Sequence, residues 1–169
     1  MATKEYAAIA AYYGTRTAQR SGVPLIQHID EGLFVLDRIG ASDAAKRAYC
    51  LHPLLQADAE LAVNHQRLAE FTDDTYVVML AIEYRNIANA TLSTREIKAA
   101  ADIALSPIPE VNAMLVADKI QNYKDFILHH RATHPRSDAL DRYFRRWLER
   151  LGVSKETREE LFAVLATRR

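Results

Sequence analysis

Apolar residues recur every three or four positions along most of the chain, which is the spacing of an amphipathic helix. In the first such segment, residues 3–16, the apolar positions that share one face are Tyr6, Ile9, Ala10 and Tyr13. Convincing alternation of apolar and polar residues, the pattern of a half-buried strand, is absent from the sequence. We therefore predict an all-α bundle of about eight or nine helices.

Capping and helix-breaking residues divide this pattern into segments. The residues expected to mark helix ends are Gly40, Ser42, the capping box of Ser93 and Glu96, Pro109, Ser137 and Ser154. The predicted helices span residues 3–16, 29–39, a segment from 43 that includes His52, 58–71, 73–90, a short segment after 93, 109–130, and two closing segments that begin at 137 and 154.

Composition narrows the class of protein. A chain of 169 residues with scarce Gly and Pro is expected to form one domain, residues 1–169, with a full core. Lys+Arg and Asp+Glu number 22 each, so no net field attracts nucleic acid. The single cysteine, Cys50, excludes an internal disulfide and is expected to be a small buried residue. Without a signal sequence or a long apolar run, a cytoplasmic location and no membrane partner are expected.

An arginine-rich segment, residues 131–150, is the one local candidate for nucleic-acid binding. It contains Tyr143, Phe144 and Trp147, whose spacing is that of one helix face. We therefore expect these aromatic residues to belong to the core, with arginines extending around them to solvent.

Two histidines and an aspartate offer ligands for a divalent transition metal. His28 lies where a loop meets a helix, His52 lies near the end of the next helix, and Asp118 lies within a later one. Imidazole nitrogens and carboxylate oxygens bind such ions, and the helices of a bundle can bring them together. Asn122 follows Asp118 by one helical turn and shares its face. We expect His28, His52 and Asp118 to form the site of one Mn, Fe or Zn ion, if the protein holds an ion at all.

Three segments share residue types and spacing with one known family. They read Arg20-Ser-Gly-Val-Pro-Leu-Ile-Gln-His28, Leu51-His52-Pro53 and Ala117-Asp118-Lys-Ile-Gln-Asn122. On these residues the chain resembles the HD superfamily, most closely the RelA/SpoT-type (p)ppGpp hydrolase domains and the small stand-alone ppGpp hydrolases of animals. The resemblance implies an HD-type helical bundle, a manganese ion and a nucleotide ligand. The residues expected against that nucleotide are Arg20, Gln56, Asn122 and Lys124.

The chain departs from that family next to its second histidine. The family has an Asp directly after this histidine and an acidic pair shortly afterwards. Here Pro53 takes the place of the Asp, and Gln56 and Ala57 take the places of the acidic pair. Proline cannot bind a metal ion, and the amide of Gln56 cannot accept a proton from water. These changes predict a pocket that binds a nucleotide with impaired or lost hydrolysis.

An active but rewired phosphohydrolase is the alternative interpretation. His28, His52 and Asp118 suffice for an ion with open coordination positions, and an added carboxylate could come from Asp58, Asp30 or Glu31. The last two are also expected to form the acidic first turn of their helix. In a further alternative the domain is a scaffold for a protein partner or a second copy of the chain.

Overall fold

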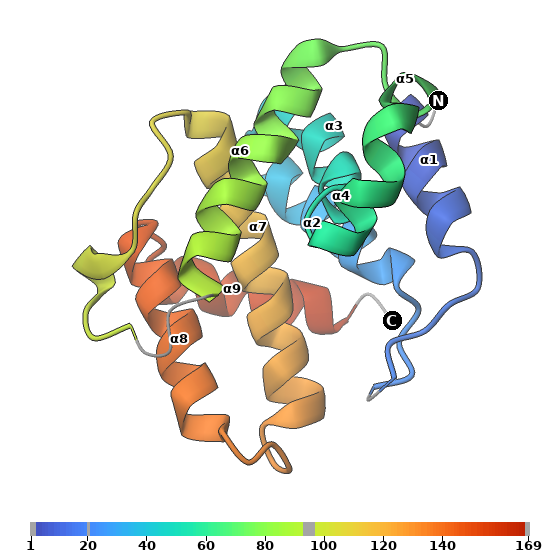
Figure 1. Ribbon diagram of the computed structural model, residues 1–169. Coiled ribbons are helices and arrows are strands. Elements are labelled where there is room, and N and C mark those ends of the chain that lie inside the picture. The colour runs from blue at the N-terminus through green and yellow to red at the C-terminus, as the bar shows by residue number, and fades with distance from the viewer. Residues whose placement is uncertain (1–2, 20, 93–96, 168–169) are drawn as a thin grey trace.

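The computed structural model describes residues 3–19, 21–92 and 97–167, and helices dominate these residues (Figure 1). The extended pairing in this part of the chain is an isolated bridge between Thr17 and Pro24. The predicted all-α bundle is therefore confirmed. None of the helices described is long and apolar enough to cross a membrane. The α-helices are α1 Lys4–Tyr13, α2 Ile26–Arg38, α3 Asp43–Leu51, α4 Asp58–Asn64, α5 Leu68–Phe71, α6 Thr75–Leu92, α7 Pro109–Asp125, α8 Ser137–Arg150 and α9 Lys155–Ala166.

Shorter turns of other helix types join these elements. They are the 3₁₀ turns η1 His52–Leu54, η2 His65–Arg67 and η3 Ala100–Asp102, and the π-helix η4 Phe126–His130.

Helix α7 runs through the middle of the bundle and contacts α2, α3, α6, α8 and α9 (Figure 1). It begins at Pro109, as predicted, because the missing N–H of proline has no partner to lose at the first helical position. Buried polar groups need hydrogen-bond partners, and α7 carries four polar side chains that are buried. They are Asp118, Lys119, Gln121 and Lys124.

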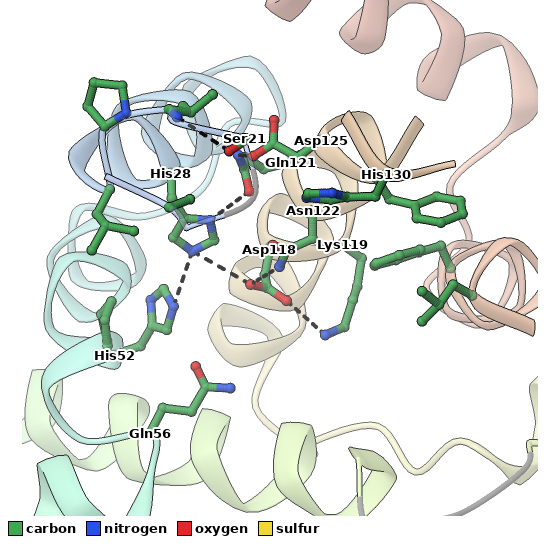
Figure 2. A pocket seen from close by; sticks show the side chains of 18 of the residues that line it. Ser21, His28, His52, Gln56, Asp118, Lys119, Gln121, Asn122, Asp125 and His130 are labelled. Carbon is green, nitrogen blue, oxygen red and sulfur yellow. Dashed lines mark hydrogen bonds and ion pairs between the residues drawn. The ribbon is translucent and has the colours of Figure 1, made fainter. Parts of the chain in front are cut away.

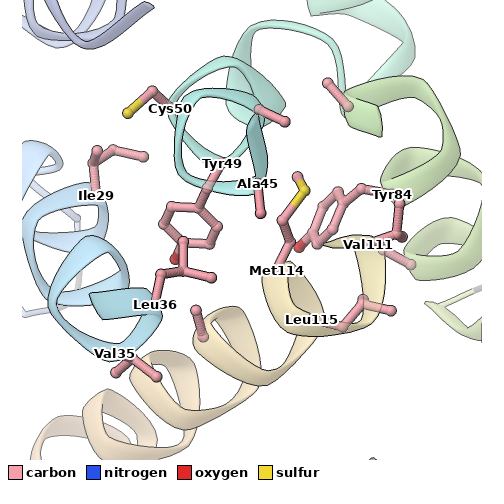
Figure 3. Close-up of a cluster of buried hydrophobic side chains, with 14 of the residues drawn as sticks. Ile29, Val35, Leu36, Ala45, Tyr49, Cys50, Tyr84, Val111, Met114 and Leu115 are labelled. Carbon is pink, nitrogen blue, oxygen red and sulfur yellow. The ribbon is translucent and has the colours of Figure 1, made fainter. Parts of the chain in front are cut away.

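The apolar core fills the space between α2, α3, α6 and α7 (Figure 3). Tyr49 and Tyr84 are fully buried in it, and Cys50 is buried as predicted. Gly32 on α2 is needed for this packing, because a Cβ atom there would lie 2.2 Å from the ring of Tyr49. The close approach lets the Tyr49 ring reach the histidines of the candidate site.

Most of the arginine-rich segment forms α8, and it packs as expected. Trp147 and Leu148 are buried, while Tyr143 and Phe144 are partly buried against the core. The aromatic residues of 131–150 therefore serve packing, as their spacing predicted.

Capping side chains explain where two helices begin. The hydroxyl of Ser42 accepts a hydrogen bond from the Ala45 N–H, and that of Ser154 accepts one from the Thr157 N–H. Both predicted N-caps are confirmed. The predicted cap at Ser137 is wrong: Ser137 is the first residue of α8, and its hydroxyl donates to the carbonyl of Arg131 instead.

Two other predicted boundaries are corrected. The segment 58–71 is not one helix but α4, η2 and α5, and at the break the buried side chain of Asn64 donates to the Leu54 carbonyl. Helix α2 begins at Ile26, three residues earlier than predicted, so Asp30 and Glu31 do not form its first turn. The predicted capping box of Ser93 and Glu96 lies outside the described residues.

Candidate metal centre

Three side chains from three helical elements meet at one end of a pocket of about 570 Å³ (Figure 2). His28 comes from the first turn of α2, His52 from the junction of α3 and η1, and Asp118 from the middle of α7. The Nε2 atoms of the two histidines are 3.4 Å apart, and His28 Nε2 is 3.7 Å from Asp118 Oδ1. The three predicted ligands therefore lie together, with their ligand atoms within 4.8 Å of one another.

The other nitrogen of each imidazole is held by a hydrogen-bond acceptor. His28 Nδ1 lies 2.7 Å from Gln121 Oε1, and His52 Nδ1 lies 2.6 Å from the Tyr49 carbonyl oxygen. An acceptor at Nδ1 assigns the hydrogen of a neutral imidazole to that nitrogen and leaves the lone pair on Nε2. Both Nε2 lone pairs therefore point into the same small space.

The spacing of these atoms fits a metal ion. Two imidazole nitrogens bound at about 2.0–2.1 Å with a tetrahedral angle between them lie about 3.4 Å apart. The observed separation of the two Nε2 atoms is 3.4 Å. Two nitrogen lone pairs at this distance repel each other, and a cation between them relieves the repulsion. The donor set of two histidines and one carboxylate also leaves coordination positions open.

The position of His52 follows from the local sequence. Tyr49 lies one turn before His52, so its carbonyl is within reach of the His52 ring. Pro53 has no N–H to continue the α-helix, and the chain turns through η1 directly after His52. The rings of Tyr49 and Tyr84 each lie 4.7 Å from that of His52 between centroids and enclose it.

At neutral pH the surroundings of His52 and Asp118 hold each side chain in the protonation state that binds a metal ion. Burial, helped by the nearby His28, lowers the pKa of His52 to about 3, so its imidazole is neutral. Burial raises the pKa of Asp118, but the Lys119 ammonium and the two histidines outweigh it and lower the pKa to about 2. A neutral imidazole and an ionised carboxylate are the forms that bind metal.

Asp118 has two protein partners of its own. Its Oδ1 accepts from Asn122 Nδ2 at 2.7 Å, and its Oδ2 accepts from Lys119 Nζ at 2.8 Å. Lys119 is 5% exposed and lies over the rings of Trp147 and Tyr143, at 5.0 and 5.8 Å. Lys119 did not emerge from the sequence as a site residue. Its position directly after Asp118, in a helix with apolar neighbours, was the available signal.

The four predicted ligand-contacting residues have different surroundings. Gln56 and Asn122 line the pocket with the three candidate metal ligands. Lys124 does not: it is 4% exposed, and its ammonium lies 2.5 Å from a carboxylate oxygen of Glu31. The predicted contact of Lys124 with a nucleotide is therefore corrected, because its charge is already paired inside the bundle. Arg20 lies outside the described residues.

The carboxylates considered as replacements for the missing Asp have other partners. Asp58 forms an ion pair with Arg85, Asp30 accepts a hydrogen bond from Tyr6, and Glu31 binds Lys124. Among the described residues, Asp118 supplies the one carboxylate of the metal group. The predicted compensation from these three acids is therefore corrected, and the candidate group in the described part of the chain consists of His28, His52 and Asp118.

The far wall of the pocket is set by the π-helix η4. Asp118, Asn122 and Phe126 follow one another at steps of four and line the pocket. With α-helical geometry throughout, His130 would lie about 120° around the axis from Asp118. The wider π turn, about 4.4 residues, reduces this to about 50°. His130 consequently lines the pocket too.

Comparison with protein-family models, with curated proteins and with solved structures finds no match. The resemblance to the HD superfamily stays a prediction. The site is therefore interpreted from its own geometry: two aligned imidazoles and one carboxylate that could hold a divalent ion at the end of an open pocket.

Proposed function

We propose that the protein binds a nucleotide-type phosphate ester in this pocket, next to one divalent ion held by His28, His52 and Asp118, with little or no hydrolysis. The observation that carries the proposal is the 3.4 Å separation of two Nε2 atoms whose partner nitrogens are both occupied. The resemblance to (p)ppGpp hydrolases supports a nucleotide as the ligand class.

The chain's own residues support binding more than turnover. A divalent ion, when bound, supplies Lewis acidity to a phosphoryl oxygen. Gln56 and Asn122 offer amide groups that can hydrogen-bond a phosphate or a sugar. The Gln56 backbone is fixed by a 2.9 Å hydrogen bond from Asn89 to its carbonyl. Hydrolysis needs a group that takes a proton from water, and an amide cannot do so.

The acids along the described lining of the pocket are both engaged. Asp118 belongs to the metal group, and Asp125 accepts from Gln121 and pairs with Lys124. A carboxylate free to act as a general base is therefore missing from this lining, and efficient hydrolysis would have to use another group, such as the imidazole of His130 or His134, which also line the pocket.

An active phosphohydrolase is the second candidate, and one observation favours it. Three protein ligands leave coordination positions open, and these face the pocket. An ion with open positions can activate water without a nearby carboxylate.

Metal content tests the site. The purified protein is stripped with chelator, incubated with Mn²⁺ or Zn²⁺, desalted and measured by elemental analysis. About one ion per chain is expected in the wild type and in His65→Ala, an exposed histidine that serves as the control. The ion should be lost in His28→Ala and in Asp118→Ala. A wild-type protein that retains no ion would overturn the proposal.

Nucleotide assays then separate the two candidates. Binding of ppGpp without turnover supports the proposal, while metal-dependent hydrolysis that disappears in His52→Ala supports the phosphohydrolase. Gln56→Glu sharpens the test, because it adds a carboxylate at the pocket. General-base catalysis contributes about 10²–10⁴-fold, so this variant should gain hydrolysis while Gln66→Glu, on the exposed surface, should not. Unchanged turnover in Gln56→Glu would show that a missing base is not what limits hydrolysis.

A further inference from the structure

A largely buried polar network adjoins His28 and extends from the pocket lining to α2. Its members are Gln121, Lys124 and Asp125 of α7 and Glu31 of α2, which also accepts a 2.8 Å hydrogen bond from Gln27. Gln121 is 1% exposed, Glu31 is 3% exposed and Lys124 is 4% exposed. Lys124 Nζ lies 2.6 and 2.5 Å from the two carboxylate oxygens of Glu31 and 2.8 Å from Asp125 Oδ1. With two carboxylates and one ammonium, the network carries a net charge of −1.

The network fixes the orientation of the Gln121 amide. Gln121 Nε2 donates one hydrogen to Asp125 Oδ2 at 2.7 Å and the other to Glu31 Oε2 at 3.2 Å. Carboxylates accept hydrogen bonds and do not donate them, so the amide nitrogen must face these two groups. The amide oxygen is left to face His28 Nδ1, at 2.7 Å. The carboxylates therefore determine, through Gln121, which imidazole nitrogen of His28 carries the hydrogen.

We propose that Gln121 is a positioning residue that holds His28 as the Nδ1–H tautomer, with its Nε2 lone pair directed at the metal site. The proposal rests on the proposed function, since it concerns the same site. Partners of this kind orient metal-bound histidines in proteins, and their loss typically weakens metal binding by about 10–100-fold.

The network also supplies charge that the ligands lack. Asp118 is the one carboxylate in the metal group, and the Lys119 ammonium lies 2.8 Å from it. The net negative charge of the network reaches His28 through the polarised Gln121 amide and favours a cation at Nε2. A carboxylate cluster behind a histidine thus replaces part of the charge missing at Pro53.

Histidine NMR on the metal-free protein tests the tautomer directly. In ¹⁵N-labelled protein, two-bond ¹H–¹⁵N correlations identify which ring nitrogen carries the hydrogen. His28 should be the Nδ1–H tautomer in the wild type and should shift toward Nε2–H in Gln121→Leu. Tyr123→Phe is the matched control. Tyr123 lies on the same helix as Gln121, and the change removes the hydrogen bond that its hydroxyl donates to Asp141 without altering the network. It should leave the His28 tautomer unchanged.

Zinc affinity, measured by competition with a chelator, gives the second readout. Gln121→Leu should bind Zn²⁺ about 10–100-fold more weakly than the wild type, and Tyr123→Phe should match the wild type. An unchanged tautomer together with unchanged zinc affinity in Gln121→Leu would overturn the inference while the metal site stands.

The two proposals fail in different ways. A wild-type protein that binds no Zn²⁺ would contradict the proposed metal site. The comparison of the His28 tautomer in the wild type and in Gln121→Leu would still test the role of Gln121. If Gln121→Leu does not fold, the wild-type spectrum alone is decisive: an Nε2–H tautomer at His28 contradicts the assignment, and an Nδ1–H tautomer supports it.

Discussion

Two buried lysines on α7, five positions apart, form ion pairs of opposite character. Lys124 lies between two carboxylates, Glu31 and Asp125, and none of the three belongs to the metal group. Among the described residues Lys119 forms its ion pair with Asp118, a candidate metal ligand, and its ammonium rests over two aromatic rings. Lys124 completes a network of two carboxylates, whereas Lys119 shares the carboxylate of Asp118 with the candidate ion.

The difference shows what each positive charge does for the site. Lys124 neutralises one of two acids and leaves a negative charge behind His28. Lys119 cancels the charge of Asp118 at the place where a cation would bind. Two similar dipeptides, Asp118-Lys119 and Lys124-Asp125, should therefore have opposite effects on metal binding, because Lys119 pairs with a candidate ligand while Lys124 pairs with Glu31 of α2.

The largest expected effect comes from removing Lys124. Lys124→Met leaves Glu31 buried without its counter-ion, and breaking a buried ion pair in this way costs about 3–5 kcal/mol. The free energy of unfolding, measured by urea titration, should fall by that amount. Lys4→Met, which breaks a 2.7 Å pair with Asp73 on the surface, is the control and should cost less than about 1 kcal/mol. Equal losses in the two variants would contradict the structural role given to Lys124.

Acidification should destabilise the protein through His52 while Asp118 keeps its pair with Lys119. The unfolded imidazole takes up a proton below about pH 6.5, whereas burial keeps the folded one neutral down to about pH 3. The unfolded state therefore binds more protons in this interval, and stability falls as the pH falls. Between pH 6.5 and 5 the loss is about 2 kcal/mol in metal-free protein.

The pH effect can be assigned by substitution. His52→Gln removes the titrating group, so urea titrations at pH 5 and 6.5 should differ much less than in the wild type. The Asp118 carboxyl, with a pKa of about 2, stays ionised throughout this range and keeps its pair with Lys119. If His52→Gln retains the full pH dependence of the wild type, a group other than His52 causes the loss of stability.

Removing Lys119 should strengthen metal binding. Lys119→Met takes a positive charge away from Asp118 Oδ2, and the affinity for Zn²⁺ should rise about tenfold, because the ion no longer shares that carboxylate with an ammonium. Chelator competition measures the change, and Lys155→Met, on the exposed surface of α9, is the control. Weaker binding in Lys119→Met would mean that the lysine serves mainly to orient Asp118.

The smallest effect is expected at the edge of the Lys124 network. The Asp125 side chain is 25% exposed, and an amide oxygen can still accept the hydrogen bond from Gln121. Asp125→Asn should therefore lower stability by less than about 1 kcal/mol, measured by the same urea titration. A loss as large as that of Lys124→Met would show that solvent does not screen this carboxylate.

Local rules predicted much of the fold. The periodicity of apolar residues gave the all-α class, and the caps at Ser42 and Ser154 act within their own helix turn. The predicted N-cap at Ser137 was wrong because its hydroxyl donates a hydrogen bond to the Arg131 carbonyl instead of accepting one from its own helix. The breaks inside 58–71 depend on Asn64 reaching η1, which is a contact between segments and leaves no local signal.

The candidate site was predictable to the extent that its residue types are distinctive. His28, His52 and Asp118 lie together, as proposed from their spacing and context. The partners of these ligands were harder to predict, because they depend on which face of α7 meets which helix. Gln121 and Lys124 lie in the same predicted helix as Asp118, yet only their contact with Glu31 of α2 shows that they act behind His28.

The π-helix η4 contains one residue more than a regular α-helical turn would need at this place. Five residues at about 4.4 per turn sweep about 410°, close to the roughly 400° of four residues at α-helical spacing. Deleting one residue from 126–130 and relaxing the backbone to a regular α-helix should therefore leave the following chain, with Tyr143 and Phe144 of the pocket lining, in nearly the same direction. The surplus residue in η4 is accommodated within one widened turn, so a one-residue deletion here should be tolerated better than a deletion within α7.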